Sequence, residues 1–257
     1  MCGIVGAWAK EDHIPFSVVD TLFKFNEKRG RDGFGYSKIN LNTNDIETRK
    51  SAFAYSDNVF AQLELDSLPK DHMLLGICRA KPETEVETRE EDLERTMQPI
   101  VRDNCIVVHN GSINTYYDNC ESWKQTDIDS ECIIYQYIKR GFPKFVEYIP
   151  GGFSFLLYDK NKKSLIIGTN HMPLYHMYIK GVGYFVSSVK EALDEILNYY
   201  FSLKHDSMNV WEAWYHTEVE AFSVREIDLD SGMIKKFDFK PLYLLPGQLS
   251  KKSARCR

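Results

Sequence analysis

The 257-residue sequence has none of the patterns that are typical of membrane-spanning, secreted or nucleic-acid-binding chains. Residues 2–9 are apolar, but no positive region precedes them and Lys10 follows at once, which is unlike a signal peptide. No apolar run approaches the roughly 20 residues that a bilayer requires. The formal net charge of −5 argues against general affinity for nucleic acid phosphates. We therefore expect a cytoplasmic protein that binds no membrane, and the charge does not indicate a nucleic acid partner.

The cysteines and histidines also lack the spacings of disulfide frameworks and metal sites. Six cysteines are present, with no CxxC pair among them. Cys78, Cys105 and Cys132 lie in apolar or half-apolar segments, which is typical of packed thiols in a reducing compartment. His171 and His176 stand in strand-like surroundings, which favours structural roles. We expect no metal and no organic cofactor.

Linkers, internal repeats, low-complexity stretches and nucleotide-binding fingerprints are missing as well. A hydrophobic content of 43% and a charged content of 27% are ordinary for a globular protein. We expect one domain over residues 1–240 and a flexible tail with a basic end over residues 241–257, too short to fold by itself. The charge-rich residues 83–95 are expected to form a solvated loop or helix.

Hydrophobic periodicity and turn residues divide the chain into many short strands and a few helices. Strands are expected at residues 2–9, 74–78, 105–109, 153–158, 164–168, 174–179 and 184–187, with a hairpin over 222–239. Helices are expected at residues 17–27, 130–140 and 188–200, the first capped by Ser17 and the second stopped by Gly141. This pattern predicts an α+β fold of two packed antiparallel sheets with helices outside them.

A cysteine directly follows the initiator methionine, in residues 1–6, MCGIVG. Aminopeptidases remove methionine before small residues, and Cys2 would then carry both a thiol and a free α-amine. The unperturbed pKa values of these groups are about 8.5 and about 8, so the amine can take the thiol proton during attack on a carbonyl. A lone cysteine is more often a buried small hydrophobe. The motifs that follow favour the nucleophile.

Further motifs follow in a fixed order. They are RGRDGFG at residues 29–35, Gln-Pro at 98–99, His-Asn-Gly at 109–111, Asp-Ser-Glu at 129–131, Pro-Leu-Tyr at 173–175 and YFVSSVKEAL at 184–193. With residues 1–6, this order resembles the class II glutamine amidotransferases, N-terminal-nucleophile (Ntn) enzymes that take ammonia from glutamine. The resemblance covers residues 1–193, and more loosely residues up to about 240. It implies the four-layer αββα Ntn-hydrolase sandwich.

The resemblance assigns Cys2 as the nucleophile and the Asn110 amide and Gly111 N–H as donors to the oxyanion. Tetrahedral attack on an amide needs two such donors, and glycine lets the backbone approach the substrate. An Asn-Gly pair is also a common hairpin turn, but the presence of Cys2 favours the oxyanion hole. The residues Arg29 and Asp32 are expected to be scaffold beside the nucleophile.

Two charged residues match the ends of free glutamine. Arg79 resembles the family arginine that pairs with the α-carboxylate, although an arginine that ends a strand can also simply reach solvent. Asp129 resembles the carboxylate that holds the α-ammonium. A helix cap is the alternative role for Asp129, and Asp127 is the alternative ligand if the helix register shifts.

The loop after Arg79 departs from the family pattern. The family usually has an aromatic residue and a threonine there, whereas this chain reads Ala80-Lys81-Pro82-Glu83-Thr84. The sequence therefore leaves the closure of this loop over glutamine undecided.

The resemblance implies a glutaminase that supplies ammonia to a separate acceptor synthetase or transferase. Two alternatives remain open at this point. One is an N-terminal cysteine hydrolase of a γ-glutamyl or other amide. The other is a non-catalytic binding or regulatory subunit with the same fold, and this alternative gains if Met1 is retained.

Overall fold

Two antiparallel β-sheets form the centre of the protein. The computed structural model describes residues 1–58, 67–81, 89–203 and 217–243. The first sheet has the strand order β11-β9-β10-β1-β4-β2-β3, and the second has the order β13-β12-β8-β7-β6-β5. The tail predicted at 241–257 lies outside the described residues from 244 onward, and so do residues 83–88 of the charge-rich segment.

The bounds of the strands are as follows. The first sheet contains β1 (Gly3–Ala9), β2 (Phe34–Asn40), β3 (Ile46–Ser51), β4 (His72–Cys78), β9 (Tyr175–Ile179), β10 (Gly183–Ser187) and β11 (Thr217–Glu218). The second sheet contains β5 (Ile100–Arg102), β6 (Cys105–Ile113), β7 (Gly151–Asp159), β8 (Ser164–Thr169), β12 (Ser223–Asp228) and β13 (Ile234–Asp238).

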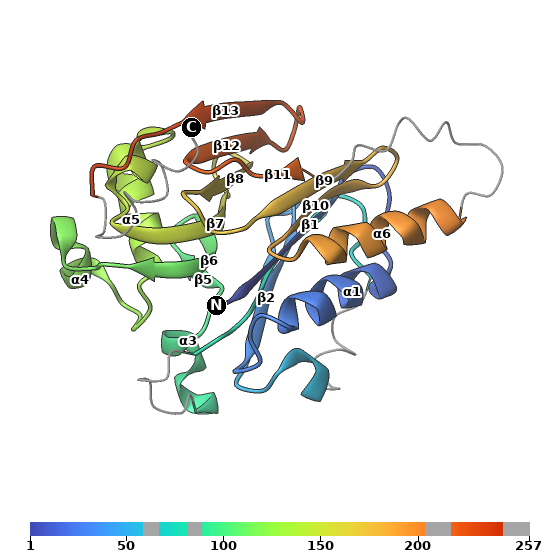
Figure 1. Cartoon of the computed structure of the whole chain (residues 1–257), viewed down its shortest axis with the longest axis horizontal. Coiled ribbons are helices and arrows are strands. Elements are labelled where there is room, and N and C mark those ends of the chain that lie inside the picture. The colour runs from blue at the N-terminus through green and yellow to red at the C-terminus, as the bar shows by residue number, and fades with distance from the viewer. Residues whose placement is uncertain (59–66, 82–88, 204–216, 244–257) are drawn as a thin grey trace, which may run out of the picture.

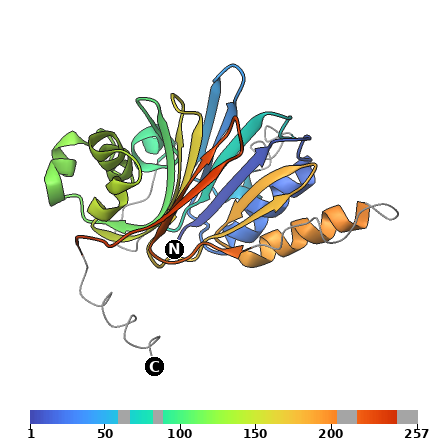
Figure 2. The same ribbon diagram turned by 90° about the horizontal axis from the view of Figure 1, so that it is seen from above.

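Helices cover the outer face of each sheet (Figures 1 and 2). The helices α1 (Phe16–Glu27) and α6 (Lys190–Leu203) pack on the first sheet, and α5 (Glu131–Arg140) packs on the second. The shorter helical segments are α3 (Leu93–Thr96), α4 (Cys120–Trp123), η1 (Tyr55–Asp57), η2 (Glu90–Asp92), η3 (Tyr117–Asn119) and η4 (Lys144–Tyr148). The order of layers is helix, sheet, sheet, helix, which confirms the predicted four-layer sandwich.

The alternation of side chains along each strand produces three buried cores. On β1, Val5 faces the helices α1 and α6, whereas Ile4 and Trp8 face the second sheet. On β6, Val108 faces the first sheet and Val107 faces α5. Because both faces are buried there, β1 and residues 105–108 of β6 are apolar and are recognisable in the sequence.

The predicted strands and the three long helices are confirmed, with small differences at their ends. Ser17 does not cap α1, because the helix begins at Phe16 after Pro15 and Ser17 already lies inside it. Strands β2, β3, β5 and β11 were not expected. The strand β2 has Gly35, Ser37 and Lys38 among its apolar residues, and β3, β5 and β11 are short or charged strands at the sheet edges, where the apolar alternation is weak. Of the charge-rich segment, residues 90–96 form the short turns η2 and α3.

The structure contains a disulfide between Cys120 and Cys132, so the interpretation of Cys132 as a free packed thiol is wrong. The bond joins α4 to α5, and both sulfur-bearing residues are buried in the core beneath the second sheet. Their separation of 12 residues is not diagnostic in the sequence, because the contact arises only when α4 packs on α5. The other cysteines that the structure describes, Cys2, Cys78 and Cys105, are free.

No helix in the described part of the chain is both long and apolar enough to cross a membrane. The cytoplasmic location remains a prediction.

Reduction of the disulfide should lower the stability of the fold. Closing a loop of this size restricts the unfolded chain, so its loss should cost about 2–3 kcal/mol and lower Tm by roughly 5–10 °C. Thermal unfolding with and without a phosphine reductant measures this shift. The double variant Cys120→Ala/Cys132→Val is the control and should respond to the reductant by no more than 1 °C or so. Equal Tm values for oxidised and reduced wild type would contradict the prediction.

Candidate active site

Cys2 lies at the start of β1, between the two sheets. The strand β1 is central in the first sheet, with Gly3 opposite Cys78 of β4 and Val5 opposite Ser187 of β10. Cys2 is half-buried and packs against the core between the sheets. A side chain at Gly3 would place its Cβ 2.3 Å from the carbonyl oxygen of Asn26, so glycine is needed where α1 approaches β1. In both overall views the N-terminus lies between the sheets (Figures 1 and 2).

The carbonyl of Cys2 is fixed by the arginine of the glycine-rich loop. Arg29 Nε donates to the Cys2 carbonyl oxygen at 3.0 Å, and Arg29 Nη1 donates to the carbonyl of Ser188 at 3.3 Å. This guanidinium therefore joins the start of β1 to the end of β10. The expected position of this loop beside Cys2 is confirmed.

The Cys2 thiol is under opposing electrostatic influences. Burial raises the pKa of the thiol, and the nearby Asp129 carboxylate adds to this. The backbone N–H of Ala80 donates to Sγ at 3.4 Å and lowers the pKa, as do the N-terminal charge and Arg79. Burial is the largest of these effects, so the pKa of the thiol remains above its ordinary value.

Arg79 follows β4, and its backbone is held by the glycine-rich loop. The N–H of Arg79 donates to Gly33 O at 2.8 Å, and the Arg79 carbonyl accepts from the N–H of Asp32 at 2.9 Å. The Asp32 carboxylate in turn accepts from the N–H of Lys81 at 2.8 Å. A Cβ at Gly30 would lie 2.3 Å from the Arg79 carbonyl. The loop thus positions Arg79 and Ala80 next to the thiol, and Asp32 acts as scaffold, as expected.

Asn110 and Gly111 lie on β6 in the opposite sheet. Side-chain alternation places Asn110 on the same face as Val108, which lines the space between the sheets to which Cys2 also contributes. The Asn110 side chain is 1% exposed, and its Nδ2 has no hydrogen-bond partner in the described part of the chain. Gly111 has a φ of +146°, and a Cβ there would lie 1.9 Å from Gly152 O. The buried, unpaired Asn110 donor therefore stands next to Gly111, whose backbone conformation favours glycine.

Asp129 precedes α5 and faces the same strand. Its Oδ2 accepts from the N–H of Ile113 at 2.6 Å, two residues beyond Gly111. Its side chain is 29% exposed, and its charge acts on the Cys2 thiol. The carboxylate is therefore anchored by the strand that carries Asn110 and Gly111.

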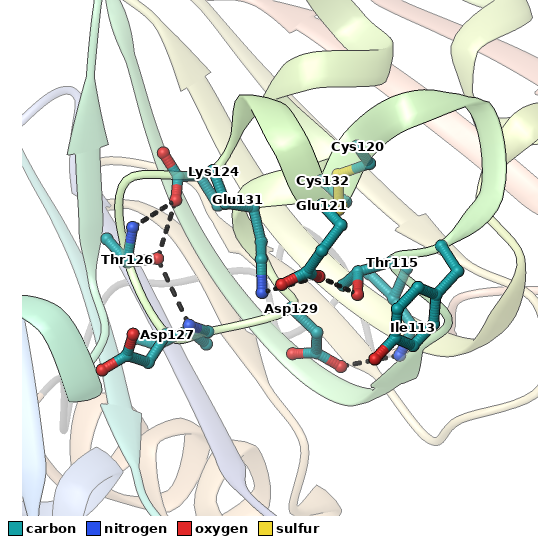
Figure 3. Close-up of polar contacts among 12 residues, drawn as sticks. Ile113, Thr115, Cys120, Glu121, Lys124, Thr126, Asp127, Asp129, Glu131 and Cys132 are labelled. Atoms are coloured by element: carbon teal, nitrogen blue, oxygen red, sulfur yellow. Dashed lines mark hydrogen bonds and ion pairs between the residues drawn. A yellow bond between two sulfur atoms is a disulfide. The ribbon is translucent and has the colours of Figure 1, made fainter.

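The two alternatives for Asp129 can be compared directly (Figure 3). Asp129 does not cap α5 through its side chain, because that carboxylate is directed to Ile113. Asp127 points away from Asp129 and bonds Arg95 at 2.9 and 3.1 Å near the surface. The arrangement favours Asp129 over Asp127 as the carboxylate that faces the site.

Three polar residues next to Asn110 and Asp129, namely His109, Ser130 and Glu131, hold this part of the site in place. The sequence analysis gave them no individual role. Glu131 is fully buried and accepts from the N–H groups of Gln125 and Thr126 and from Arg102. It therefore folds the segment before Asp129 onto the start of α5. His109 Nδ1 lies 2.8 Å from Ser130 Oγ, and burial lowers the pKa of this imidazole, which favours its neutral form. The Asp-Ser-Glu and His-Asn-Gly motifs were the available signals.

Comparison with known proteins identifies related sequences and folds. Residues 84–195 match the family described as a glutamine amidotransferase domain. The chain is 29% identical over 219 residues to 7-cyano-7-deazaguanine synthase of Saccharolobus solfataricus, covering 79% of this chain and 43% of the relative. It is 38% identical over 72 residues to asparagine synthetase B (glutamine-hydrolyzing) of Escherichia coli, covering 27% of this chain and 13% of the relative.

A solved structure shares the fold at low sequence identity. Glutamine phosphoribosylpyrophosphate amidotransferase from B. subtilis superimposes with a TM-score of 0.65 and 19% identity, over 93% of this chain and 49% of that chain. The chain thus spans less than half the length of the curated relatives that it matches over most of its own length, with 43% and 47% of those relatives covered.

The charges around Cys2 predict opposite effects of two substitutions on thiol reactivity. Thiolate is the nucleophile toward iodoacetamide, so alkylation should be slow at pH 7 and accelerate as the pH rises toward the raised pKa. Asp129→Asn removes a charge that raises this pKa and should speed alkylation at pH 8 by about 3- to 10-fold. Arg79→Met should slow it by a similar factor.

Mass spectrometry of samples quenched at successive times during Cys2 alkylation measures these rates. Asp127→Asn is the matched control, because its carboxylate bonds Arg95 instead of facing the thiol. It should alkylate at the wild-type rate. A change of the same sign in Asp129→Asn and Arg79→Met would show that the two charges do not act on the thiol.

Proposed function

Because this chain carries a class II glutamine amidotransferase domain, we propose that it hydrolyses the side-chain amide of glutamine at Cys2 and supplies the ammonia to a separate acceptor enzyme. The observation that carries the proposal is the buried Asn110 Nδ2, which has no partner in the described residues and stands beside Gly111. Buried donors are almost always paired, so an unpaired one facing the nucleophile's compartment is ready for a transient oxygen anion.

The proposed reaction begins once Met1 has been removed. The α-amine of Cys2 takes the thiol proton as sulfur attacks the side-chain carbonyl carbon of glutamine. The carbonyl oxygen becomes an anion and accepts hydrogen bonds from Asn110 Nδ2 and the N–H of Gly111. Collapse of this intermediate breaks the carbon–nitrogen bond, and the amine returns the proton to the leaving ammonia. Water then attacks the glutamyl thioester, and glutamate leaves with the thiol restored.

Two charged residues orient the substrate in this proposal. Arg79 binds the α-carboxylate and Asp129 binds the α-ammonium. Support comes from their opposite effects on the Cys2 thiol, because both charges must lie near the reacting sulfur to act on it. A γ-glutamyl amide has the same two charged groups, so the nature of the leaving amine distinguishes this alternative.

The acceptor is proposed to be a synthase that modifies a nucleobase. The curated relatives that match most of this chain are named 7-cyano-7-deazaguanine synthase, and a cyano group contains a nitrogen that ammonia can supply. Less than half of each of those relatives is matched, so the remainder of such a protein is where an acceptor activity would lie.

The intact mass before and after treatment with 6-diazo-5-oxo-norleucine, an electrophile that mimics glutamine, tests the nucleophile. We expect loss of Met1 and one adduct, located on Cys2. The Cys2→Ala variant should fold, take no adduct and release no ammonia from glutamine. A processed N-terminus without an adduct would favour another amide substrate. Retention of Met1 would favour a binding subunit, because the α-amine would then be blocked.

Steady-state kinetics should separate the donors to the oxyanion from the groups that bind glutamine. Asn110→Ala should lower kcat by about 10²–10³-fold with little change in KM, because the oxyanion exists only in the transition state. Arg79→Ala should mainly raise KM, by roughly 10- to 100-fold, because its contact is present in both states. Arg95→Ala is the control for loss of an arginine, since Arg95 pairs with Asp127. A change confined to KM in Asn110→Ala would reject its assigned role.

A further inference from the structure

The side chain of Gln98 occupies the place of a missing strand residue beside β6. The strand β5 begins at Ile100, which lies opposite Val107, and Pro99 before it has no N–H to donate. At the level of His109 there is consequently no backbone partner on this side of β6. Gln98 Oε1 accepts from the N–H of His109 at 2.6 Å, and Gln98 Nε2 donates to the His109 carbonyl at 3.0 Å. One primary amide thus pairs both backbone groups of one residue, as a strand would.

Gln98 is itself held firmly between the sheets. A Cβ at Gly35 of β2 would lie 2.2 Å from the Gln98 carbonyl oxygen and 3.0 Å from Pro99 Cδ, so the backbones touch. The preceding Met97 is fully buried and lies against Gly33, where a Cβ would come within 2.9 Å of the methionine methyl. Gln98 therefore connects the two sheets, because its backbone contacts β2 of the first sheet and its side-chain amide bonds β6 of the second.

The two bonds act on the strand segment that carries the candidate oxyanion donors. Backbone groups of alternate residues on a strand point to the same side. On one side of β6, the N–H of Asn114 donates to Pro150 O at 2.8 Å. On the other side, the N–H of His109 donates to Gln98 and the N–H of Ile113 donates to Asp129. The N–H of Gly111 belongs to this second row, between the two anchored amides.

We propose that Gln98 is a positioning residue for the oxyanion hole. Its amide fixes the peptide groups of His109, and so sets the direction of the Gly111 N–H and the placement of Asn110 beside the reacting carbonyl. This inference rests on the proposed function, because it concerns the oxygen that forms during glutamine hydrolysis. Gln98 does not touch the substrate and acts only through β6.

The substitution Gln98→Met keeps the length of the side chain and removes both hydrogen bonds. We expect kcat for glutamine hydrolysis to fall by about 10- to 100-fold with KM changed less than about threefold, because a misaimed donor weakens transition-state binding only. Alkylation of Cys2 by iodoacetamide, which forms no oxyanion, should proceed at the wild-type rate.

Gln136→Met is the matched control. Gln136 is also buried, at 1% exposure, but its Nε2 bonds Asp118 on the outer side of the second sheet, at 3.2 Å. The control should lower Tm and leave kcat unchanged. Equal losses of kcat in both variants would indicate general destabilisation and would overturn the proposal.

The substitution Gln98→Glu provides a second test, with a pH signature that does not depend on Gln98→Met being folded. An ionised carboxylate accepts from the N–H of His109 but cannot donate to its carbonyl, whereas a protonated carboxyl can do both. The ratio of kcat between this variant and wild type should therefore rise as the pH falls and the carboxyl becomes protonated. A ratio that is independent of pH, or a wild-type kcat in Gln98→Met, would overturn the proposal. Wild-type protein without glutaminase activity would instead overturn the proposed function.

Discussion

The antiparallel pairing of β6 with β7 is the constraint on which the candidate site depends. Nine consecutive pairs, from Cys105 opposite Asp159 to Ile113 opposite Gly151, fix β6 along one edge. On its other edge, β6 pairs with β5 only as far as Val107, so side chains bond the backbone of His109 and Ile113 beyond that point. Gln98 and Asp129 supply these side chains on either side of Gly111, and each comes from a different part of the chain. A single strand thereby sets the relative positions of an amide donor, a glycine N–H and a carboxylate.

The surroundings of the half-buried Cys2 thiol favour its protonated form. Burial and the Asp129 charge favour the neutral thiol, while Arg79 and the Ala80 N–H favour the thiolate. Because these influences oppose one another, the thiol need not be ionised in the resting protein. A base that is close by and weakly basic can then remove the proton during attack, which is the role that a free α-amine on Cys2 fits. Met1 is 70% exposed, so the residue whose removal would free this amine lies at the surface.

The central strands, the long helices and the order of the site motifs could be predicted from the sequence, because all three reflect local sequence patterns. The strand β1 and residues 105–108 of β6 are apolar on both faces, and α5 is stopped by Gly141, whose φ is +71°. Features that arise from contacts distant in sequence could not be predicted. The Cys120–Cys132 bond requires α4 to pack on α5. The motif already favoured Asp129 over Asp127, but the hydrogen bond from the N–H of Ile113 that holds this carboxylate could not be predicted. The role of Gln98 depends on where β5 begins, which a strand of three residues does not reveal in the sequence.

The outer strands of the second sheet have a consequence for the protein at high concentration. All five residues of β13 are exposed, and two of them are Lys235 and Lys236. At the opposite edge, β5 is only three residues long and follows Pro99. A second chain that paired with either edge would have to bury lysine charge or find too few amides to bond. Edge-to-edge growth of the second sheet onto another molecule is therefore disfavoured, even though its interior strands are strongly apolar.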